Sequence, residues 1–305
     1  MSENLYQLYT TQFSTNLQLK LQQTGSKLRG RVMEGFHTGK QASPVQYMGP
    51  IKMKTPAGRF TPKNRTDADF TRRWVFPQDG EIDQLIDSFD QLKTIVDPKS
   101  QYSTNAANAV GREWDDAVIA AATGTATTGT DVNGLTSETF DTTKFRIADS
   151  FGASAAVGLT VAKLIEARRI FRHYEVDIDS EPLTLVIGSQ QESDLLNQVQ
   201  VVSDEFNDKP VLVDGRVTRF LGFDIVVMER LPTYTTNTRG VLAFCKTGMY
   251  LGIWKETMNR VSIRNDLSSE PYDLYTQASF GSCRLEPGRL LQIACLDTVG
   301  AAITP

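Results

Sequence analysis

The chain has 305 residues, of which 40% are hydrophobic and 22% charged, and its formal net charge is −4. This is the composition of a globular protein with a sizeable core, and it excludes wholesale disorder and collagen-like or coiled-coil rods. No apolar run approaches the ~18 residues of a membrane helix. The first residues lack the basic and apolar regions of a signal peptide, so we expect synthesis in the cytoplasm. The three cysteines show no CxxC spacing, which argues against a disulfide framework or a zinc site.

The charge is distributed unevenly along the chain. Residues 1–76 hold 12 Lys and Arg against 4 Asp and Glu, a net charge of +8, whereas residues 77–305 hold 20 against 32, a net charge of −12. A basic head on an acidic body has two interpretations, contact with nucleic acid or contact with the acidic body of a neighbouring copy.

The basic head contains two predicted elements. Residues 1–26 are polar, with leucines spaced for an amphipathic helix or for an arm that lies on a surface. Residues 48–77 are predicted to form a long β-hairpin, because 51–55 alternate strictly and 70–76 form a second extended run. A lone two-stranded hairpin is marginally stable in water, so we expect this one to rest on another chain.

From residue 81 onward, the apolar residues recur at the spacing of a helix. Residues 82–89 predict a short helix, and Asp97 and Pro98 are typical of the N-cap and first position of a long one. Apolar residues at helical spacing extend this long helix over 97–123, to Gly124. Its alanines allow a close approach by a neighbouring element.

The remaining two thirds of the chain predict an α+β fold with two lobes. Residues 123–136 predict an exposed loop, Thr160 precedes a helix, and Ser189 begins a capping box. We expect a helical turn at 249–254, and a turn at 285–288 that joins the last two strands. Strands are predicted at 183–187, 211–220, 222–229, 240–245, 260–264, 271–283 and 289–297.

The sequence contains no constellation that indicates catalysis, a metal or a cofactor. His37 and His173 are the only histidines and are far apart in the sequence, and no phosphate-binding glycine loop occurs. Asp115 and Asp116 point about 100° apart on a helix, so solvation or an ion pair with Arg112 explains them better than a shared metal. We therefore expect a protein that is not an enzyme.

Three blocks of residues in series resemble the major capsid proteins of tailed bacteriophages. The first is Asp97-Pro98 with Ser100 and Tyr102, followed by Gly111-Arg112, Asp115-Asp116 and Gly124. The second block runs from Lys163 and Ala167-Arg168 through Val176-Asp177, Leu195-Leu196 and Gly222-Phe223 to Glu229-Arg230-Leu231-Pro232. The third is Tyr275 with Phe280-Gly281 and Arg284.

The resemblance implies the α+β Hong Kong 97-type capsid fold and the role of a virion shell protein. The implied segments are an N-terminal arm at 1–47, an extended loop at 48–77, a peripheral domain at 78–158 with the spine helix at 97–123, an axial domain at 159–240, and returning long strands at 241–305. The implied function is self-assembly through hexamers and pentamers into an icosahedral shell around double-stranded DNA. The implied partners are other copies of the chain, a portal protein, and scaffold or decoration proteins, with no membrane and no cofactor.

Two sets of cations are candidate contact residues. The expected intersubunit contacts lie in and beside the hairpin, at Lys52, Lys54, Arg59, Lys63, Arg65, Arg72 and Arg73. Weak contact with DNA phosphates is expected from a flexible arm, at Lys20, Lys27, Arg29 and Arg31. The alternative function is a nucleic-acid-binding module that uses the basic head.

Overall fold

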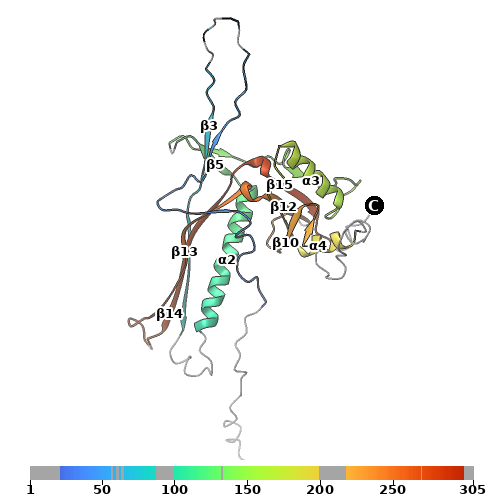
Figure 1. Ribbon diagram of the computed structural model, residues 1–305. Coiled ribbons are helices and arrows are strands. Elements are labelled where there is room, and N and C mark those ends of the chain that lie inside the picture. The colour runs from blue at the N-terminus through green and yellow to red at the C-terminus, as the bar shows by residue number, and fades with distance from the viewer. Residues whose placement is uncertain are drawn as a thin grey trace, which may run out of the picture. The chain divides into compact units, whose positions relative to one another are not determined.

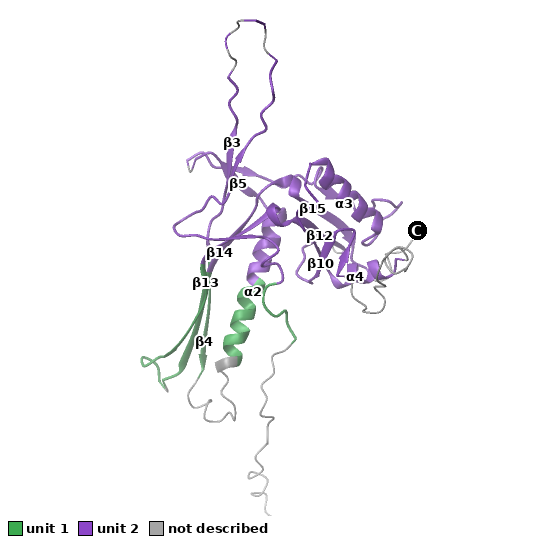
Figure 2. Cartoon of the chain, in the orientation of Figure 1, with its two compact units in different colours: residues 1–26, 79–112, 255–278 green, residues 27–78, 113–254, 279–305 purple. Residues whose placement is uncertain are grey.

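The structure is a computed structural model (Figure 1). It describes residues 21–55, 58–59, 62, 65–86, 99–131, 133–198, 218–235, 237–268 and 270–298. The chain divides into two compact units, coloured in Figure 2. Unit 1 comprises residues 1–26, 79–112 and 255–278, and unit 2 comprises 27–78, 113–254 and 279–305. The five segments expected from the resemblance stay a prediction.

The strands form three sheets. The first has the order β1-β13-β14-β4, with β1 at Met33–Phe36, β13 at Met249–Ile263, β14 at Tyr272–Arg284 and β4 at Gln78–Ile86. The second has the order β7-β15-β12-β8-β10-β9, comprising β7 (Arg146–Ile147), β15 (Leu290–Leu296), β12 (Thr238–Cys245), β8 (Leu183–Ile187), β10 (Phe223–Val227) and β9 (Arg219–Phe220), and β11 (Thr233–Thr235) pairs with β12. The third has the order β2-β3-β5-β6, comprising β2 (Gln46–Met48), β3 (Phe70–Trp74), β5 (Ala126–Gly129) and β6 (Thr136–Glu138).

The long helix α2, Lys99–Thr123, confirms the predicted spine over its described length (Figure 1). Asp97 and Pro98 lie outside the described residues. The helix ends where predicted, and the Gly124 amide donates to the Ala120 carbonyl at 2.9 Å. Its tightest contact within unit 1 is at Gly111, where a Cβ would lie 2.6 Å from the Gly25 carbonyl carbon. Glycine is therefore required at this position by the backbone that crosses the helix.

Two predicted helical segments are strands. β4 covers 82–86, where residues 82, 84 and 86 are the more buried ones, so the alternation of a strand is the relevant period. The predicted helical turn at 249–254 is the start of β13, a 15-residue strand whose first five residues are all buried. The start of β13 is buried on both faces and so has no periodicity to distinguish strand from helix. In β4 the misleading signal is Leu85, which fits the helical spacing but is 51% exposed, and residues 87–89 of the predicted helix lie outside the described residues.

The predicted loop at 123–136 is also wrong in part. Residues 126–129 form β5 and residue 136 begins β6, which pair with each other and join β3, whereas the described residues between these strands are exposed as predicted. Threonine is β-branched and suits an extended backbone, so a Thr-rich stretch is compatible with short strands as well as with a loop. The turn expected at 285–288 contains η3 (Pro287–Arg289) and connects strands of two different sheets.

Unit 2 contains the largest sheet, and two helices follow the predicted pattern. α3, Val161–His173, is capped by the Thr160 side chain, which accepts from the Lys163 amide at 3.4 Å. β8 is buried throughout and lies between β12 and β10. α4, Ser189–Leu196, begins one residue earlier than predicted, because Gly188 is the N-cap and the Gln191 side chain accepts from its amide at 3.2 Å. β8, β10, β12, β14 and β15 confirm five predicted strands, and β13 contains the strand predicted at 260–264 up to Ile263. β9 covers the end of the strand predicted at 211–220, whereas residues 199–217 lie outside the described residues.

Candidate assembly surfaces

A long loop projects from the third sheet, between β2 and β3 (Figure 1). The two strands pair antiparallel over three residue pairs, from Gln46 with Arg72 to Met48 with Phe70. One further hydrogen bond joins the Gly49 amide to the Asp69 carbonyl at 2.7 Å. β3 continues into the sheet by pairing with β5. The second strand of the predicted hairpin is thus confirmed as β3, whereas the first lies at 46–48 rather than at 51–55, and the hairpin is supported by its own sheet.

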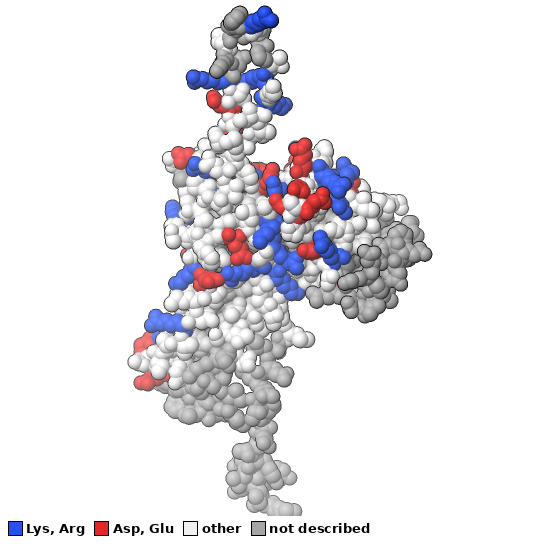
Figure 3. Space-filling model, in the orientation of Figure 1, with Lys and Arg blue, Asp and Glu red and all other residues white. Residues whose placement is uncertain are grey.

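The described residues beyond this base are exposed, including apolar ones. Met53 is 101% exposed and Ile51 56%, and between and beside them stand Lys52 and Lys54. Figure 3 shows lysine and arginine side chains along the projecting loop. Arg59 and Arg65 are exposed too, whereas Lys63 lies outside the described residues. The loop therefore offers a cationic surface and an apolar surface together.

Arg73 does not belong to this exposed set. Only 6% of the residue is accessible, and its Nε donates to the Leu285 carbonyl at 2.6 Å. Its guanidinium also forms an ion pair with Glu138 of β6 at 2.5 Å. The neighbouring Arg72 points to the opposite face of β3 and is half-buried. The expectation that Arg73 contacts another copy is corrected, because its guanidinium is bound inside the subunit.

A second buried arginine holds the same region together. Arg284, at the end of β14, is fully buried and donates to the Ala122 and Gly124 carbonyls at 2.9 and 3.0 Å. These are carbonyls at the C-terminal end of α2, which have no helical partner. Its other terminal nitrogen donates to the Glu138 carbonyl at 3.2 Å. Burial lowers the pKa of Arg284, yet an arginine stays charged in proteins.

An apolar cluster lies beside these arginines. It comprises Val75, Tyr250, Cys283 and Leu285, with Tyr47 of β2 packed against it. Burial, followed by the negative charge of Glu286, raises the pKa of Tyr47 to about 12, although Arg73 and Arg289 act in the opposite direction. The base of the projecting loop is thus fixed by apolar packing as well as by charged hydrogen bonds.

The residues before β1 are attached to unit 2 through Asp115. This carboxylate is fully buried and accepts from the Lys27 and Leu28 amides at 2.9 and 3.1 Å. Asp116, on the next face of α2, forms a bidentate ion pair with Arg230. The expected solvation or pairing of these two aspartates with Arg112 is therefore corrected. Arg112 donates within unit 1 to the Gln22 side chain at 2.7 Å.

Three of the expected DNA-contacting cations have partners in unit 2. The Lys27 ammonium donates to the Val227 carbonyl at 2.8 Å. Arg29 pairs with Glu34 at 3.3 Å and stacks on the Trp114 ring at 4.7 Å, and Arg31 lies 3.9 Å from Asp224. The expected flexible arm is thus wrong for residues 27–31, and Lys20 lies outside the described residues.

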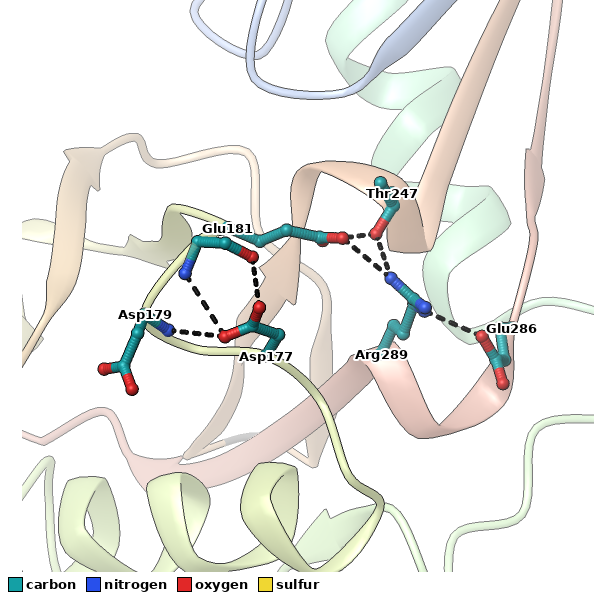
Figure 4. Close-up of polar contacts among 7 residues, drawn as sticks. Asp177, Asp179, Glu181, Thr247, Glu286 and Arg289 are labelled. Carbon is teal, nitrogen blue, oxygen red and sulfur yellow. Dashed lines mark hydrogen bonds and ion pairs between the residues drawn. The ribbon is translucent and has the colours of Figure 1, made fainter.

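A cluster of polar side chains lies at two turns, the one between β12 and β13 and the one between β14 and β15 (Figure 4). Arg289 of η3 donates to Glu181 at 3.0 Å, to Thr247 of η2 (Lys246–Gly248) at 2.5 Å and to Glu286 at 2.7 Å. Thr247 also donates to Glu181. The loop before Glu181 is ordered by Asp177, which accepts from the Asp179 amide at 3.2 Å. The charged groups of Glu181, Glu286 and Arg289 are bonded within this cluster, which favours a structural role.

The histidines and cysteines are the remaining side chains with distinctive chemistry. His37 lies 2.6 Å from the Tyr250 hydroxyl and tilts over Trp254, and burial lowers its pKa. His173 ends α3. Within the described ranges no cluster of His, Cys, Asp and Glu could hold a metal ion, and no helix is long and apolar enough to cross a membrane. All three cysteines are buried and free.

The structural and sequence comparisons agree on one kind of protein. The capsid of Cyanophage P-SCSP1u matches with a TM-score of 0.74 at 15% identity, covering 98% of this chain and 97% of that one. The Cyanophage Pam1 capsid matches with a TM-score of 0.72 at 10% identity, covering 96% and 98%. The capsid of the native GTA particle matches with a TM-score of 0.67 at 13% identity, covering 97% of both chains. No curated protein matches the sequence.

At these identities the solved structures show the fold, and they confirm the expected Hong Kong 97-type arrangement. The family is shown by the sequence itself, since the family model described as phage capsid protein matches residues 5–297. The expected self-association, virion location and structural role follow from it. The chain belongs to the phage capsid protein family and is a major capsid protein, a structural subunit of the icosahedral shell of a tailed phage.

Proposed function

We propose that the chain builds its shell through hexamers and pentamers, and that the projecting loop is the clamp between neighbouring copies. The observation that carries the proposal is the exposure of large apolar side chains at residues 48–54, on a loop that its own sheet supports only at the base. Exposed apolar patches of this kind mark interaction surfaces. The occupant is a second copy, because self-association is what a shell protein must achieve.

The two surfaces of the loop contribute differently to such a contact. Full burial of a side chain such as Ile51 or Met53 is worth about 1.5–3 kcal/mol. An ion pair of the exposed Lys52, Lys54, Arg59 or Arg65, or of the half-buried Arg72 at the base, is worth at most about 1 kcal/mol. The apolar side chains therefore supply most of the affinity, and the cations direct the loop to the acidic body of the neighbour.

A deletion of residues 55–66 tests the clamp. The subunit should fold normally, since the deletion leaves the pairing of β2 with β3 intact, and it should assemble poorly. Particle yield by sedimentation and subunit melting are the two measurements. Normal particles from the deleted chain would refute the clamp.

Point substitutions test whether the charge or the shape of the loop side chains determines assembly. Reversing Lys52, Lys54 and Arg65 to Glu should slow assembly and reduce its dependence on salt, because rim charges act mainly on association rates. The matched control exchanges Lys and Arg at the same three positions and keeps every charge, so it should assemble normally. Equal losses in both variants would show that shape, not charge, matters at these positions.

We also propose that the subunit contacts packaged double-stranded DNA without sequence preference. Lys27, Arg29 and Arg31 would have to give up partners inside the subunit to reach a phosphate, which favours weak contact. A filter-binding titration of the free subunit should show weak binding that disappears as salt rises. Tight or sequence-selective binding would favour the alternative function as a nucleic-acid-binding module. A portal protein and scaffold or decoration proteins remain proposed partners.

A further inference from the structure

Two carboxyl groups face each other across β4 and β14 in unit 1. The Tyr275 hydroxyl of β14 donates to Glu81 of β4 at 2.8 Å. In an antiparallel pair, a step of two residues forward on one strand corresponds to two residues back on the other. β4 and β14 are neighbours in the sheet, and counting from the Glu81–Tyr275 contact places Asp83 opposite Asp273 on the same face, where the charge of Asp273 acts on Asp83. Like charges directly opposite one another destabilise a strand pair.

One carboxylate oxygen of Asp273 lacks a hydrogen-bond donor. The residue is only 9% exposed, and its Oδ1 is buried without a hydrogen-bond partner. The nearest cation, Arg264, lies 3.9 Å from the other oxygen and makes two closer bonds of 2.7 and 2.8 Å to Asp266. An ionised Asp83 has only acceptors, so it can serve Oδ1 only when it carries a proton.

We propose that Asp83 and Asp273 share one proton and form a pH-dependent latch that fastens β4 to β14. When the proton is present, the Asp83 hydroxyl donates to Asp273 and the strands are held together. When the proton leaves, two carboxylates face each other and the pairing is weakened. β4 is the outer strand of its sheet, next to β14 alone, so the latch controls how firmly that edge is closed.

The other charged groups on this face determine the direction of the effect. The hydrogen bond to Asp273, followed by desolvation and by repulsion from the same group, raises the pKa of Asp83, and Arg264 opposes this. By position in the strands, Asp79 and Glu81 of β4 and Arg260 of β13 share the face, with Tyr275 between Glu81 and β13. Because the folded state binds the proton more tightly than the unfolded state, stability increases as the pH falls through the raised pKa.

Hydrogen exchange of the full-length chain tests the latch. The protection of the β4 amides, corrected for intrinsic exchange, should fall about two- to fivefold as the pH rises from about 4.5 to 7.5, the range expected for a cross-strand pair of like charges. Protection of β15 in unit 2 should stay constant. The Asp83→Asn variant keeps a donor for Asp273 and removes one charge, so its β4 protection should be independent of pH and exceed that of the wild type at pH 7.5.

The matched control is Glu81→Gln, which makes the same change of charge on the same face of β4. Its amide oxygen can still accept from Tyr275, and its β4 protection should follow the wild-type pH profile. A flat wild-type profile would overturn the latch. So would an Asp83→Asn profile that parallels the wild type, or a Glu81→Gln variant that flattens the profile equally, since the effect would then come from net charge alone.

Discussion

The projecting loop and the base that carries it use the same kinds of residues in opposite ways. In the loop, cations such as Lys54 and Arg65 are exposed, together with Ile51 and Met53. In the base, Arg73 and Arg284 are buried. The base binds its arginines to carbonyl oxygens of its own chain, namely those of Leu285, Ala122, Gly124 and Glu138.

This difference shows that composition alone does not tell which basic residues face a partner. An arginine with two or three backbone acceptors in reach can be buried, because each donor that loses water gains a charged hydrogen bond. A lysine or arginine on a loop with no such acceptors stays in water and is available to a neighbour. Subunit stability and assembly should therefore respond to different substitutions.

The largest effect is expected for Arg284→Met. It leaves the Ala122, Gly124 and Glu138 carbonyls without their donor inside the protein, and the loss of one partner from a buried charged network costs about 3–5 kcal/mol. Urea unfolding of the full chain measures this. The control Arg219→Met changes an arginine whose side chain is 72% exposed, and its cost should stay below about 1 kcal/mol. Equal costs would show that the burial of Arg284 has no special importance.

A smaller effect is expected from the pair Arg73→Met and Arg72→Met. These residues are neighbours on β3, and only Arg73 is fully buried. Arg73→Met should cost about 2–3 kcal/mol, because the Leu285 carbonyl loses a charged donor. Arg72→Met should lie within about 0.5 kcal/mol of the wild type in the same unfolding experiment. If both substitutions lower the free energy of unfolding equally, the burial of Arg73 does not distinguish it from its more exposed neighbour.

Tyr47 adds a pH dependence to the base. Its pKa is raised to about 12 from an ordinary value of 10.0, so between these values the folded state holds a proton that the unfolded state has lost. Stability from this group is therefore complete below pH 10 and decreases as the pH rises toward 12. Above pH 10, the free energy of unfolding of the Tyr47→Phe variant should decrease less steeply with pH than that of the wild type. Its effect should be under about 1 kcal/mol because the ring is partly exposed to solvent.

Cys283 shares this cluster and also titrates in alkali, since burial raises the pKa of its thiol to about 12. The measured quantity is therefore the difference between Tyr47→Phe and the wild type, in which the contribution of Cys283 cancels. No difference above pH 10 would mean that the Tyr47 phenol has its ordinary pKa.

The sequence predicted those parts of the fold in which local signals and packing agree. The spine helix has helical spacing and a glycine end, and α3 has the Thr160 cap, so both were found. The start of β13 and residues 82–86 of β4 are predicted as helical because their apolar runs are short, although the strand predicted at 260–264 lies in the later part of β13. Strand pairing with a distant segment determines the structure of both. Arg284 was quoted only as part of a motif, since no local pattern shows that carbonyls 160 residues away will surround it.

The exposed cations of the projecting loop and its base were also predicted only in part, because distant segments decide which of them are buried. The alternation at residues 51–55 predicted a strand of the hairpin, but the ladder ends at Met48 and Phe70 and residues 51–55 are not in a strand. It could not separate Arg73 from Lys54, because the difference arises from Leu285 and Glu138, which are far away in the sequence. The attachment of residues 27–31 likewise depends on Asp115, whose buried carboxylate caps two amides. Long-range acceptors, rather than local composition, determined which cations are exposed.

The smallest effect on the subunit is expected for the loop itself. Ile51→Ser and Met53→Ser together should leave the free energy of unfolding within about 0.5 kcal/mol of the wild type, because neither side chain is buried in the subunit. The same double variant should form fewer particles, since each side chain would lose about 1.5–3 kcal/mol of burial at every contact between copies. Urea unfolding of the free subunit and sedimentation of assembled particles measure the two quantities on one preparation. A destabilised subunit would mean that the loop packs on its own chain, and unchanged particles would mean that these side chains stay exposed in the shell.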